Sequence, residues 1–590
     1  MAGEFKGDFT RDTFYAHRHY WSVFQQQGRV SLDADGNEQA SILLNLLRGV
    51  SKEVIADGDA GPNKQFNLVQ ITPPAGSTDR DFGIMPGHVF VDGIQAILNG
   101  WKNPFSIPST AAANAGQVAV SQWLVDGIPY QKGQYVIGVL VDPNNPADTP
   151  FTSTVPSSID SLDPNSRTLT LKPALTAPAG PQSGYRLIRL PSFLHQPDYV
   201  PTDDEIKALN ALSPNKNASL VYLDVWERHV SFVQNPWIRE VALGGPDTCV
   251  RSQLLAQVKI AFDLKSQDLR TFNADSLPVV KSALEDQYQP YNRGWLRARL
   301  KPVDSNNPDP CMCHPDARYR GAENQLYRVE IHLPGKARSS STTTVEVASP
   351  ASGGSSSSTP TFKWSRNNGC DVYPVISVKA AEVMLDSVGR DVRSTLKSGD
   401  WVELLDDILI LQGKPGQLLQ VSEVSAQDRR VTLGSASTHD FVAKDPNHAH
   451  AFLRRWDQKD PATGGASSGL PITEAATPQT DPWIDLEDGI QIQFITALSP
   501  NLPNSPSGGN LVAPVNVYRT GDYWLIPART ALQGSIEWPA TTDNPPVPIA
   551  LPPHGIDHHY LPLGVVTLAN ATSNQLGVTS PFISQIAPIT

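Results

Sequence analysis

The stretch FGIMPGHVFVDGIQAIL, residues 82–98, decides the fold class because it has the pattern of two short strands joined by a turn. Apolar residues alternate with polar ones around Val89, Val91 and Ile94, and glycines stand at turn positions. Alternation with a period of two buries one face of a strand and exposes the other. The stretch therefore predicts a β-hairpin with one face against a core.

The same pattern recurs along the chain, in YVIGVLVDP at 135–143, SRTLTLKPAL at 166–175 and SGYRLIRLPSF at 183–193. The sequence also contains 51 prolines in 590 residues, spread over most of its length. Proline is excluded from helix interiors and from central strands, so this distribution favours short strands joined by fixed turns. We expect a mainly β fold.

A chain of 590 residues is too long for one core, and a prior of about 150 residues per domain suggests roughly three to five units. We expect several small β-sandwich or barrel-like modules with an N-terminal helical segment. Composition places the helical docking segment at 1–60, β-rich modules at 61–200, 201–338 and 362–460, a Ser/Thr/Gly-rich loop or linker at 339–361, and a C-terminal β-rich segment at 461–590.

A helical pattern runs from about Tyr20 to Val50. Gly28 and the cluster of Asp33, Asp35 and Gly36 favour a turn, so we expect either two helices or a strand-like break followed by one amphipathic helix that begins near Asn37. At the other end of the chain, alternating apolar residues in LEDGIQIQF predict a strand with one buried face. We expect the last 100 or so residues to return to an earlier core.

The net charge and the targeting signals of a sequence limit which partners and which cell compartment are expected. The formal net charge is −12, without a long run of like charges, which argues against nucleic-acid binding. The start, MAGEFKGDFTRDTF, lacks an apolar signal region, and no apolar run of about 20 residues follows. We expect cytoplasmic synthesis without a signal peptide, with the four cysteines reduced.

Two short motifs are candidate metal sites. Cys311, Cys313 and His314 carry the thiolates and the imidazole that zinc prefers, although a second ligand pair is missing nearby; the alternative is a loop with free cysteines. A second group, His554, His558 and His559, lies in the proline-flanked stretch PPHGIDHHYLPL. The alternative for these histidines is hydrogen bonding to turn carbonyls.

Paired carboxylates are candidates for glycoside hydrolysis, which requires two carboxyl groups held about 5–10 Å apart. The pairs are Asp33 with Asp35, Asp406 with Asp407, and Asp485 with Glu487 and Asp488. Turn formation is the alternative role. The sequence has no GxSxG, phosphate-binding glycine loop, HExxH or CxxC motif, so we assign no catalytic residue and no cofactor and expect a non-enzymatic protein.

Several phrases set a tryptophan beside arginine or an acidic residue: VWERH, KWSRNNG, LRRWDQ, DYWLIPART and IEWP. Such phrases suit buried aromatic anchors with charged edges, or contacts between subunits. Core packing and interface use both remain open from the sequence alone.

Together with GDFTRDTF, QQGRVSLDADGNEQASILL, LVYLDVWERHV, YRGAENQLYRVEIH, LEDGIQIQF and PPHGIDHHYLPLG, these phrases resemble a large family of unassigned domain function. Its members occur in gene clusters of contractile injection systems and related phage-tail-like particles. The resemblance covers nearly the whole chain, and the Ser-rich insert and the region 100–120 depart from it.

The resemblance implies a structural role at or near the baseplate of such a particle, in assembly, anchoring or target attachment. Other baseplate or tail subunits are then the expected partners, and the chain is expected to form a trimeric or hexamer-related homo-oligomer. A membrane or a glycan surface is a further expected partner. The particle that contains the chain is either anchored to a membrane or released. Our candidates for the assembly interface are Phe9, Phe14, Tyr15, Tyr20 and Trp21. The alternatives are a carbohydrate- or surface-binding fibre protein and a polysaccharide-degrading enzyme.

Overall fold

The protein is described from a computed structural model, in which the chain divides into two compact units. Unit 1 comprises residues 1–44, 227–253 and 289–557, and unit 2 comprises residues 45–226, 254–288 and 558–590. The structure describes residues 5–55, 57–59, 66–73, 79–98, 102–106, 114–125, 128–142, 145–150, 156–176, 185–213, 218–261, 276–290, 292–302, 317–339, 359–389, 391, 393–443, 445, 448–459, 469–475, 480–496, 515–531, 534–544, 546–568 and 575–580.

The fold is mainly β and multidomain, as the sequence predicts, and an N-terminal helix is present. The helices are α1 (Asp33–Val54), α2 (Asp203–Asn210), α3 (Leu277–Tyr288), α4 (Asp407–Leu411) and the short 3-10 turns η1 (Ala16–Arg18), η3 (Pro236–Ile238) and η4 (Val241–Leu243). No helix in the described part of the chain is long and apolar enough to cross a membrane.

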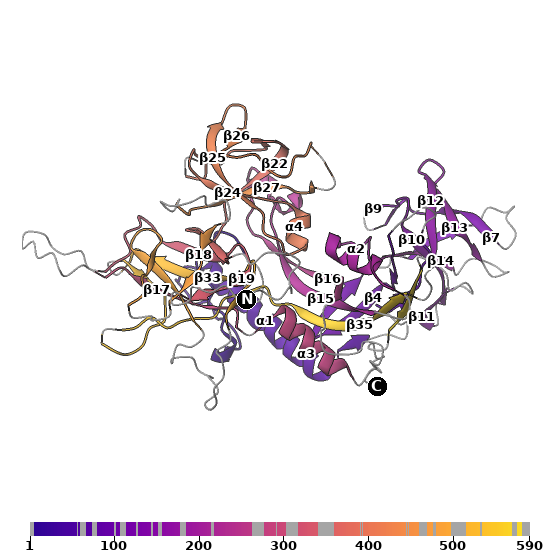
Figure 1. Ribbon diagram of the computed structural model, residues 1–590, viewed down its shortest axis with the longest axis horizontal. Coiled ribbons are helices and arrows are strands. Elements are labelled where there is room, and N and C mark those ends of the chain that lie inside the picture. Colours follow the sequence, from indigo (N-terminus) through magenta and orange to yellow (C-terminus); the bar gives the residue numbers. More distant parts are fainter. Residues whose placement is uncertain are drawn as a thin grey trace, which may run out of the picture. The chain divides into compact units, whose positions relative to one another are not determined.

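The centre of unit 2 is a four-stranded sheet to which the end of the chain returns. Its order is β16 (Arg251–Ala261), β15 (Ala218–Val230), β35 (His559–Leu568) and β36 (Leu576–Thr579). β35 runs antiparallel to β15, with Leu220 opposite Val565, and Figure 1 shows the yellow β35 beside β15. Val280 and Leu284 of α3 pack on this sheet. The expected return of the C-terminal segment to an earlier core is confirmed here.

The opening hairpin of the sequence forms in unit 2. It consists of β4 (Gly87–Val91) and β5 (Ile94–Leu98), joined to β1 (Gly58–Asp59), and a two-stranded ribbon of β2 (Leu68–Val69) and β3 (Gly83–Ile84) lies in the same unit. Val89, Val91 and Ile94 are buried in one apolar core. The alternation in the sequence therefore predicted the buried face correctly.

A second module of unit 2 is a ring of strands. The sheet order is β11 (Asn145–Pro150), β10 (Tyr135–Asp142), β12 (Ser157–Asp163), β13 (Thr168–Thr176), β7 (Asn114–Val120), β6 (Lys102–Ser106) and β14 (Tyr185–Leu190). Because β14 also pairs with β10, six of these strands form a closed circle of pairings. A small ribbon of β8 (Leu124–Val125) and β9 (Ile128–Pro129) accompanies it.

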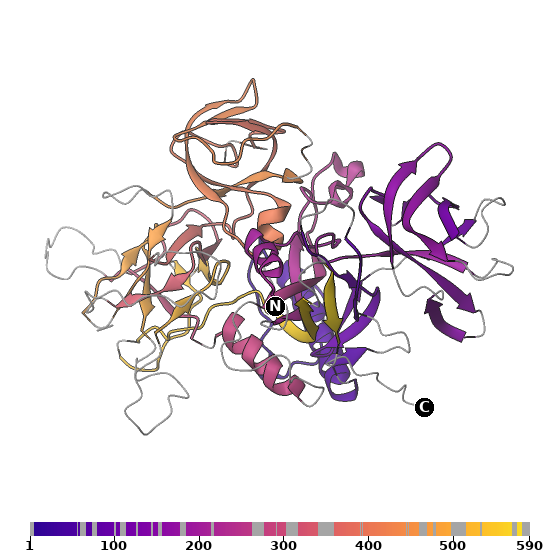
Figure 2. The ribbon, with the colours of Figure 1, turned by 45° about the vertical axis from the view of Figure 1, so that its right-hand side comes forward.

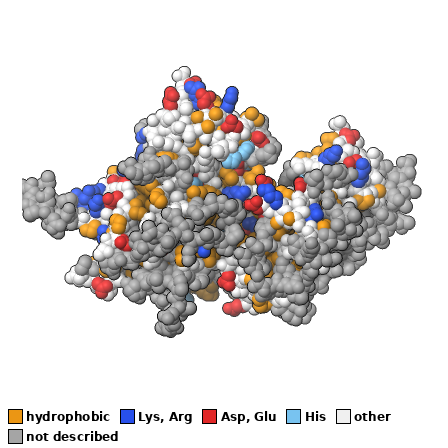
Figure 3. All heavy atoms as spheres, in the orientation of Figure 1, with side chains coloured by type: hydrophobic (Ala, Val, Ile, Leu, Met, Phe, Trp, Pro, Cys, Tyr) orange, Lys and Arg blue, Asp and Glu red, His pale blue; other side chains and the backbone are white. Residues whose placement is uncertain are grey.

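Unit 1 contains a closed six-stranded barrel. The strand order is β22 (Val372–Lys379), β23 (Glu382–Leu385), β26 (Arg430–Leu433), β25 (Gln417–Ser425), β24 (Trp401–Leu405) and β27 (Phe452–Trp456). Its interior is apolar and includes Val383, Val402, Val431 and Leu453. Figure 3 shows acidic and basic side chains interspersed on the outer end of this barrel, where β25 and β26 are drawn in Figure 1.

The other part of unit 1 is a sandwich of a five-stranded and a three-stranded sheet. The five strands are β28 (Leu470–Pro471), β21 (Thr361–Ser365), β18 (Gln325–Ile331), β33 (Tyr523–Arg529) and β34 (Ser535–Ile536), and the three are β17 (Trp295–Leu300), β31 (Ile490–Ile495) and β30 (Ile484–Asp485). Trp364, Trp524 and Phe494 share one core between these sheets. Figure 2 shows this region below the barrel. Two ribbons complete the unit: β19 (Gly335–Lys336) with β32 (Val517–Tyr518), and β20 (Arg338–Ser339) with β29 (Thr473–Glu474).

Helix α1 begins at Asp33, so the start expected near Asn37 was wrong by one turn. The acidic residues that suggested a turn form the first turn of the helix, where carboxylates interact favourably with the free N–H groups and the helix dipole. Asp33 also accepts hydrogen bonds from the backbone N–H and the hydroxyl of Thr10. The Asp cluster therefore forms the beginning of the helix, whereas we expected it to form a turn before the helix.

Candidate functional site

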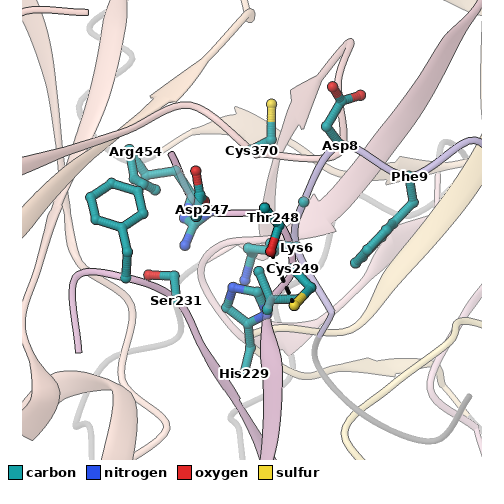
Figure 4. A pocket seen from close by; sticks show the side chains of 14 residues that line it. Lys6, Asp8, Phe9, His229, Ser231, Asp247, Thr248, Cys249, Cys370 and Arg454 are labelled. Carbon is teal, nitrogen blue, oxygen red and sulfur yellow. Dashed lines mark hydrogen bonds between the residues drawn. The ribbon is translucent and has the colours of Figure 1, made fainter. Parts of the chain in front are cut away.

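A pocket of about 280 Å³ lies within unit 1, and we take it as the candidate functional site. Its walls come from five separate stretches of the sequence, and Figure 4 shows their side chains around the opening. The lining residues are Lys6–Phe9 of the N-terminal segment, His229 of β15 with Ser231 and Phe232 directly after this strand, Asp247–Val250, and Cys370, Val372 and Arg454 of the barrel region.

Lys6 connects this pocket to a group of buried charges in unit 1. Its ammonium lies 3.2 Å from the Glu330 carboxylate, and each side chain is only 4% exposed. Arg328, which is fully buried, donates from Nε to the same carboxylate at 2.6 Å and places its guanidinium 3.6 Å from the ring centre of Tyr523. We call Lys6, Arg328, Glu330, Lys363 and Glu403 the buried ionic cluster.

The second half of the cluster joins the sandwich to the barrel. Lys363 of β21 donates to Glu403 of β24 at 2.5 Å and lies 3.3 Å from Glu330. Glu403 also accepts hydrogen bonds from the Trp456 indole at 2.9 Å and from the Gly416 backbone at 3.0 Å. Buried charges are stable only when they are paired and hydrogen-bonded, and both glutamates meet this condition.

The N-terminal segment is held in place by the same groups. The carbonyl of Phe5 accepts from Arg328 at 3.0 Å, and the carbonyl of Gly7 accepts from the Asn368 side chain at 3.1 Å. A Cβ at Gly369 would lie 3.6 Å from side-chain carbons of both Lys6 and Arg454, so these two residues flank it. The first residues of the described chain are therefore part of the unit 1 core.

Positive charges dominate the inner wall of the pocket. Burial, together with the neighbouring cations Arg328, Arg454 and Lys363, holds the pKa of Lys6 well below its usual value despite Glu330. Burial lowers the pKa of Arg454 to about 10. Burial and the charges of Arg454 and Lys6 also keep the pKa of His229 well below its usual value, so this imidazole is neutral at pH 7.

Two polar atoms of the pocket lining have no hydrogen-bond partner among the described residues. They are Nε of Arg454 and Nδ1 of His229, both shielded from solvent. Arg454 is buried and donates from Nη1 to the carbonyl of Gly369. Buried polar atoms in proteins are nearly always hydrogen-bonded, so an unpartnered donor at a pocket wall calls for an explanation.

The two described cysteines line this pocket and differ in chemistry. Cys249 is exposed, and the hydrogen bond from Arg251 Nη1 to its sulfur at 2.7 Å lowers its pKa. Cys370 is half-buried, and burial raises its pKa. A thiolate is the reactive form of cysteine, so Cys249 is the more nucleophilic of the pair.

His558 and His559, which are neighbours in the histidine motif, bind different carboxylates. His558 pairs with Asp224 at 2.7 Å, and His559 pairs with Asp92 at 3.0 Å. Consecutive residues of an extended chain point to opposite faces, which explains why neighbours in sequence bind different carboxylates. His554, in unit 1, stacks on Tyr523 with ring centres 5.6 Å apart.

Cys311, Cys313 and His314 lie outside the described residues. Within the described ranges, no group of three or more His, Cys, Asp or Glu side chains gathers closely enough to hold a metal ion. The proposed zinc and histidine sites therefore stay predictions from the sequence.

The paired carboxylates have structural partners. Asp406 caps α4, accepting from the Leu409 backbone at 2.8 Å, and Asp407 binds Arg228 at 2.5 Å. Asp485 binds Lys301 at 2.9 Å, and Glu487 binds Arg366 at 2.9 Å. Of these contacts, that of Asp406 is a helix cap, and those of Asp407, Asp485 and Glu487 are ion pairs.

The five aromatic residues predicted for assembly differ in exposure. Phe9 and Phe14 are half-buried, and Phe9 lines the pocket. Tyr15, Tyr20 and Trp21 are exposed. The segment that carries them is held to α1 by polar contacts, including Thr13 to Glu38 at 2.6 Å and Val23 to Gln39 at 2.8 Å.

Helix α1 presents an apolar stripe to solvent, which we call the α1 stripe: Leu43, Leu47, Val50 and Val54. These side chains are 54–64% exposed. At 100° per residue, Ala34 and Lys52 lie roughly half a turn away from the stripe. Ala34 is buried, and the backbone of Lys52 approaches the turn at Gly93 closely. The sequence predicted an amphipathic helix, but the apolar face points outward.

Comparison with known proteins gives one match. A family model described as "Family of unknown function (DUF6519)" matches residues 5–107, 194–290 and 289–575, which is more than half of the chain. Neither a curated protein nor a solved structure matches. The unmatched stretch 108–193 contains β7 to β14, and so most of the ring of strands in unit 2.

Proposed function

Since the chain belongs to the family of unknown function DUF6519, for which no activity is described, we propose that it is a structural subunit of a phage-tail-like contractile injection particle. In this role it sits at or beside the baseplate and acts in assembly, anchoring or target attachment. The sequence resemblance set out above motivates the particle, and the α1 stripe is the observation that carries the assembly role.

The spacing of the α1 stripe is that of a helix–helix seam. Leu43, Leu47, Val50 and Val54 are separated by four, three and four residues, the interval of the a and d positions of a heptad. Soluble chains rarely leave such a row of large apolar side chains in water, and larger exposed patches mark interaction sites. A second copy of this helix, in the neighbouring subunit of a homo-oligomer, has the matching seam.

The aromatic residues of the N-terminal segment extend the apolar surface in unit 1. Tyr20, Trp21 and Phe24 are exposed, while hydrogen bonds from Ser22 and Val23 to Gln39 hold their backbone beside the first half of α1. Aromatic residues are enriched in the centres of protein interfaces, because they bury a large area with few rotatable bonds. We propose that these residues and the α1 stripe act together in docking.

The test is incorporation of substituted chains into particles. In the double variant Leu47→Gln, Val50→Gln, loss of two buried apolar contacts, each worth about 1.5–3 kcal/mol, should reduce occupancy in purified particles by at least about tenfold. The matched control is Val442→Gln, an exposed apolar residue of the barrel region. Quantitative mass spectrometry of the particles measures occupancy.

Thermal unfolding of the isolated chain checks that the double variant still folds. Exposed substitutions away from special features change stability by about 0.5 kcal/mol or less. Normal occupancy of a folded double variant would remove the assembly role of the helix. Absence of the wild-type chain from purified particles would remove the particle assignment itself.

One observation favours a second candidate, attachment to a lipid surface. The short turns η3 and η4 carry Trp237, Val241 and Leu243, of which Trp237 is 94% exposed. An exposed loop with tryptophan and aliphatic residues suits insertion at a membrane interface. Vesicle flotation of wild-type protein and of Trp237→Ser tests this, and a signal on a glycan array alone would favour carbohydrate binding instead.

A further inference from the structure

The pocket of unit 1 has a lining of two opposite kinds. Arg454 and Lys6 contribute cationic groups, and the carboxylates of Asp8 and Asp247 line the same opening, as Figure 4 shows. Asp8 is exposed and Asp247 is half-buried. The pocket thus combines a buried cationic wall with an acidic, solvent-facing wall.

The charges of the pocket differ in how well they are paired inside the protein. Lys6 is neutralised by Glu330 at 3.2 Å. Arg454 keeps an unpartnered Nε, and His229 keeps an unpartnered Nδ1, among the described residues. Because the Arg454 guanidinium belongs to the pocket lining, an acceptor oxygen of a ligand would pair with it, since hydrogen bonds to charged groups are the strong ones.

The acidic wall of the pocket would bind a cationic group of a ligand. Within the described ranges, the carboxylates of Asp8 and Asp247 form no salt bridge, unlike the two glutamates of the buried ionic cluster. A purely anionic ligand would be repelled by these two carboxylates. A ligand that carries an ammonium beside its carboxylate matches both walls.

The volume of the pocket and its apolar side chains limit which ligands fit. Pockets for drug-sized ligands have volumes of about 300–1,000 Å³, so 280 Å³ suits a smaller molecule. Phe9, Phe232, Val250 and Val372 supply apolar surface between the charged groups. A carboxylate, an ammonium and a short apolar body describe an α-amino acid.

We propose that this pocket binds a small zwitterion of the α-amino acid class, with its carboxylate on Arg454 and its ammonium on Asp247. The proposal is independent of the particle role, because it concerns groups within unit 1 and none of the α1 stripe. One wall of the pocket is the segment Lys6–Phe9, so the bound molecule also contacts the N-terminal segment.

The test uses the full chain and calorimetry with each of the common L-amino acids in turn. For the best one, two matched analogues follow, one without the ammonium and one without the carboxylate; for leucine these are 4-methylpentanoate and 3-methylbutylamine. Each charged hydrogen bond contributes about 1.5–3 kcal/mol, so each analogue should bind at least about tenfold more weakly. Equal affinity of either analogue, or binding by no amino acid, overturns the proposal.

Two substitutions locate the binding. Asp247→Asn leaves no buried charge unpaired; it should weaken the amino acid about tenfold and leave the carboxylate analogue as tight or tighter. Arg454→Gln should abolish both, with circular dichroism to confirm folding. If the Arg454 variant does not fold, Asp247→Asn decides alone, and unchanged amino-acid affinity in it overturns the proposal.

The wild-type chain offers an independent readout at Cys249, which is exposed in the pocket wall. At a ligand concentration tenfold above Kd, mass action leaves about one tenth of the pockets open, so alkylation of Cys249 should slow about tenfold. Sodium chloride at the same concentration is the control. Protection that chloride reproduces, or no saturable protection, contradicts binding at this place.

Discussion

The Lys6 ammonium and the Glu330 carboxylate lie 3.2 Å apart in the core of unit 1, although the two residues belong to opposite parts of the sequence. Glu330 also contacts Arg328 and Lys363, so one buried carboxylate serves three cations. Removing it leaves Lys6 and Arg328 without their carboxylate partner, whereas Lys363 keeps Glu403. This arrangement makes Glu330 the most sensitive position of the cluster.

We expect Glu330→Gln to destabilise unit 1 by roughly 3–5 kcal/mol, the usual cost of breaking a buried ion pair. The double variant Lys6→Met, Glu330→Gln should lose at least about 1 kcal/mol less than the sum of the single variants, because it also removes one unpaired cation. Urea unfolding followed by hydrogen exchange in β18 measures these differences. Glu382→Gln, from the exposed pair with Arg430, is the control and should change stability little.

Glu330 also gives a prediction for how the stability of unit 1 changes at acidic pH. Burial opposes ionisation of Glu330, but Lys6, Arg328 and Lys363 prevail and lower its pKa to about 2. Its stabilising contribution is therefore present above pH 4.5 and is lost as the pH falls from about 4.5 towards about 2. Unit 1 of Glu330→Gln should show a shallower loss of stability over this range, and an identical acid profile would contradict the pairing.

Glu474 should behave in the opposite way. It is buried, accepts hydrogen bonds from Asn516 at 2.7 Å and Tyr518 at 2.8 Å, and burial raises its pKa to about 7. The folded state binds its proton more tightly, so stability is full below pH 4.5 and falls by about 3 kcal/mol as the pH rises to about 7. Glu474→Gln keeps the acceptor oxygen and should remove this fall; exposed Glu423→Gln should retain it.

Two glycines test how α1 packs in unit 2. Gly93 has φ +77°, and a Cβ there would lie 2.3 Å from the Arg48 carbonyl oxygen of the helix, whereas Gly133 has φ +88° and open space. Gly133→Ala should cost about 1 kcal/mol for its backbone conformation alone. Gly93→Ala should cost at least about 2 kcal/mol more, with faster hydrogen exchange in residues 45–54. Equal costs would show that the helix does not rest on this turn.

The two cysteines of the pocket should react at different rates. The lowered pKa of Cys249 and the raised pKa of Cys370 predict that iodoacetamide at pH 7.5 modifies Cys249 first, which peptide mass spectrometry can follow. Arg251→Gln should slow Cys249 and leave Cys370 unchanged. Faster reaction at Cys370 would contradict the contact between Arg251 and the thiol.

Local elements were predictable from the sequence because their causes are local. The alternation at Val89, Val91 and Ile94 reports burial directly, and the hairpin forms as predicted. The start of α1 was missed because Asp residues favour both turns and first helical turns. The outward direction of the α1 stripe was not predictable, since periodicity does not tell whether an apolar face meets the chain's own core or a partner.

The site was harder to predict because its residues meet only in three dimensions. Lys6, His229 and Arg454 share no local motif, and their spacing exceeds any window used to read a sequence. A partial signal was present in the tryptophan phrases, since KWSRNNG contains Lys363 and LRRWDQ contains Arg454. Trp364 and Trp456 are buried, so core packing accounts for both phrases.

The contacts within unit 1 also determine when its N-terminal segment can reach its final position during synthesis. Residues 5–9 leave the ribosome before their partners Arg328 and Asn368, which are translated hundreds of residues later. Contacts this distant in sequence form slowly and leave early segments uncovered during synthesis. The N-terminal segment therefore reaches its final contacts in unit 1 only after Arg328 and Asn368 have been translated.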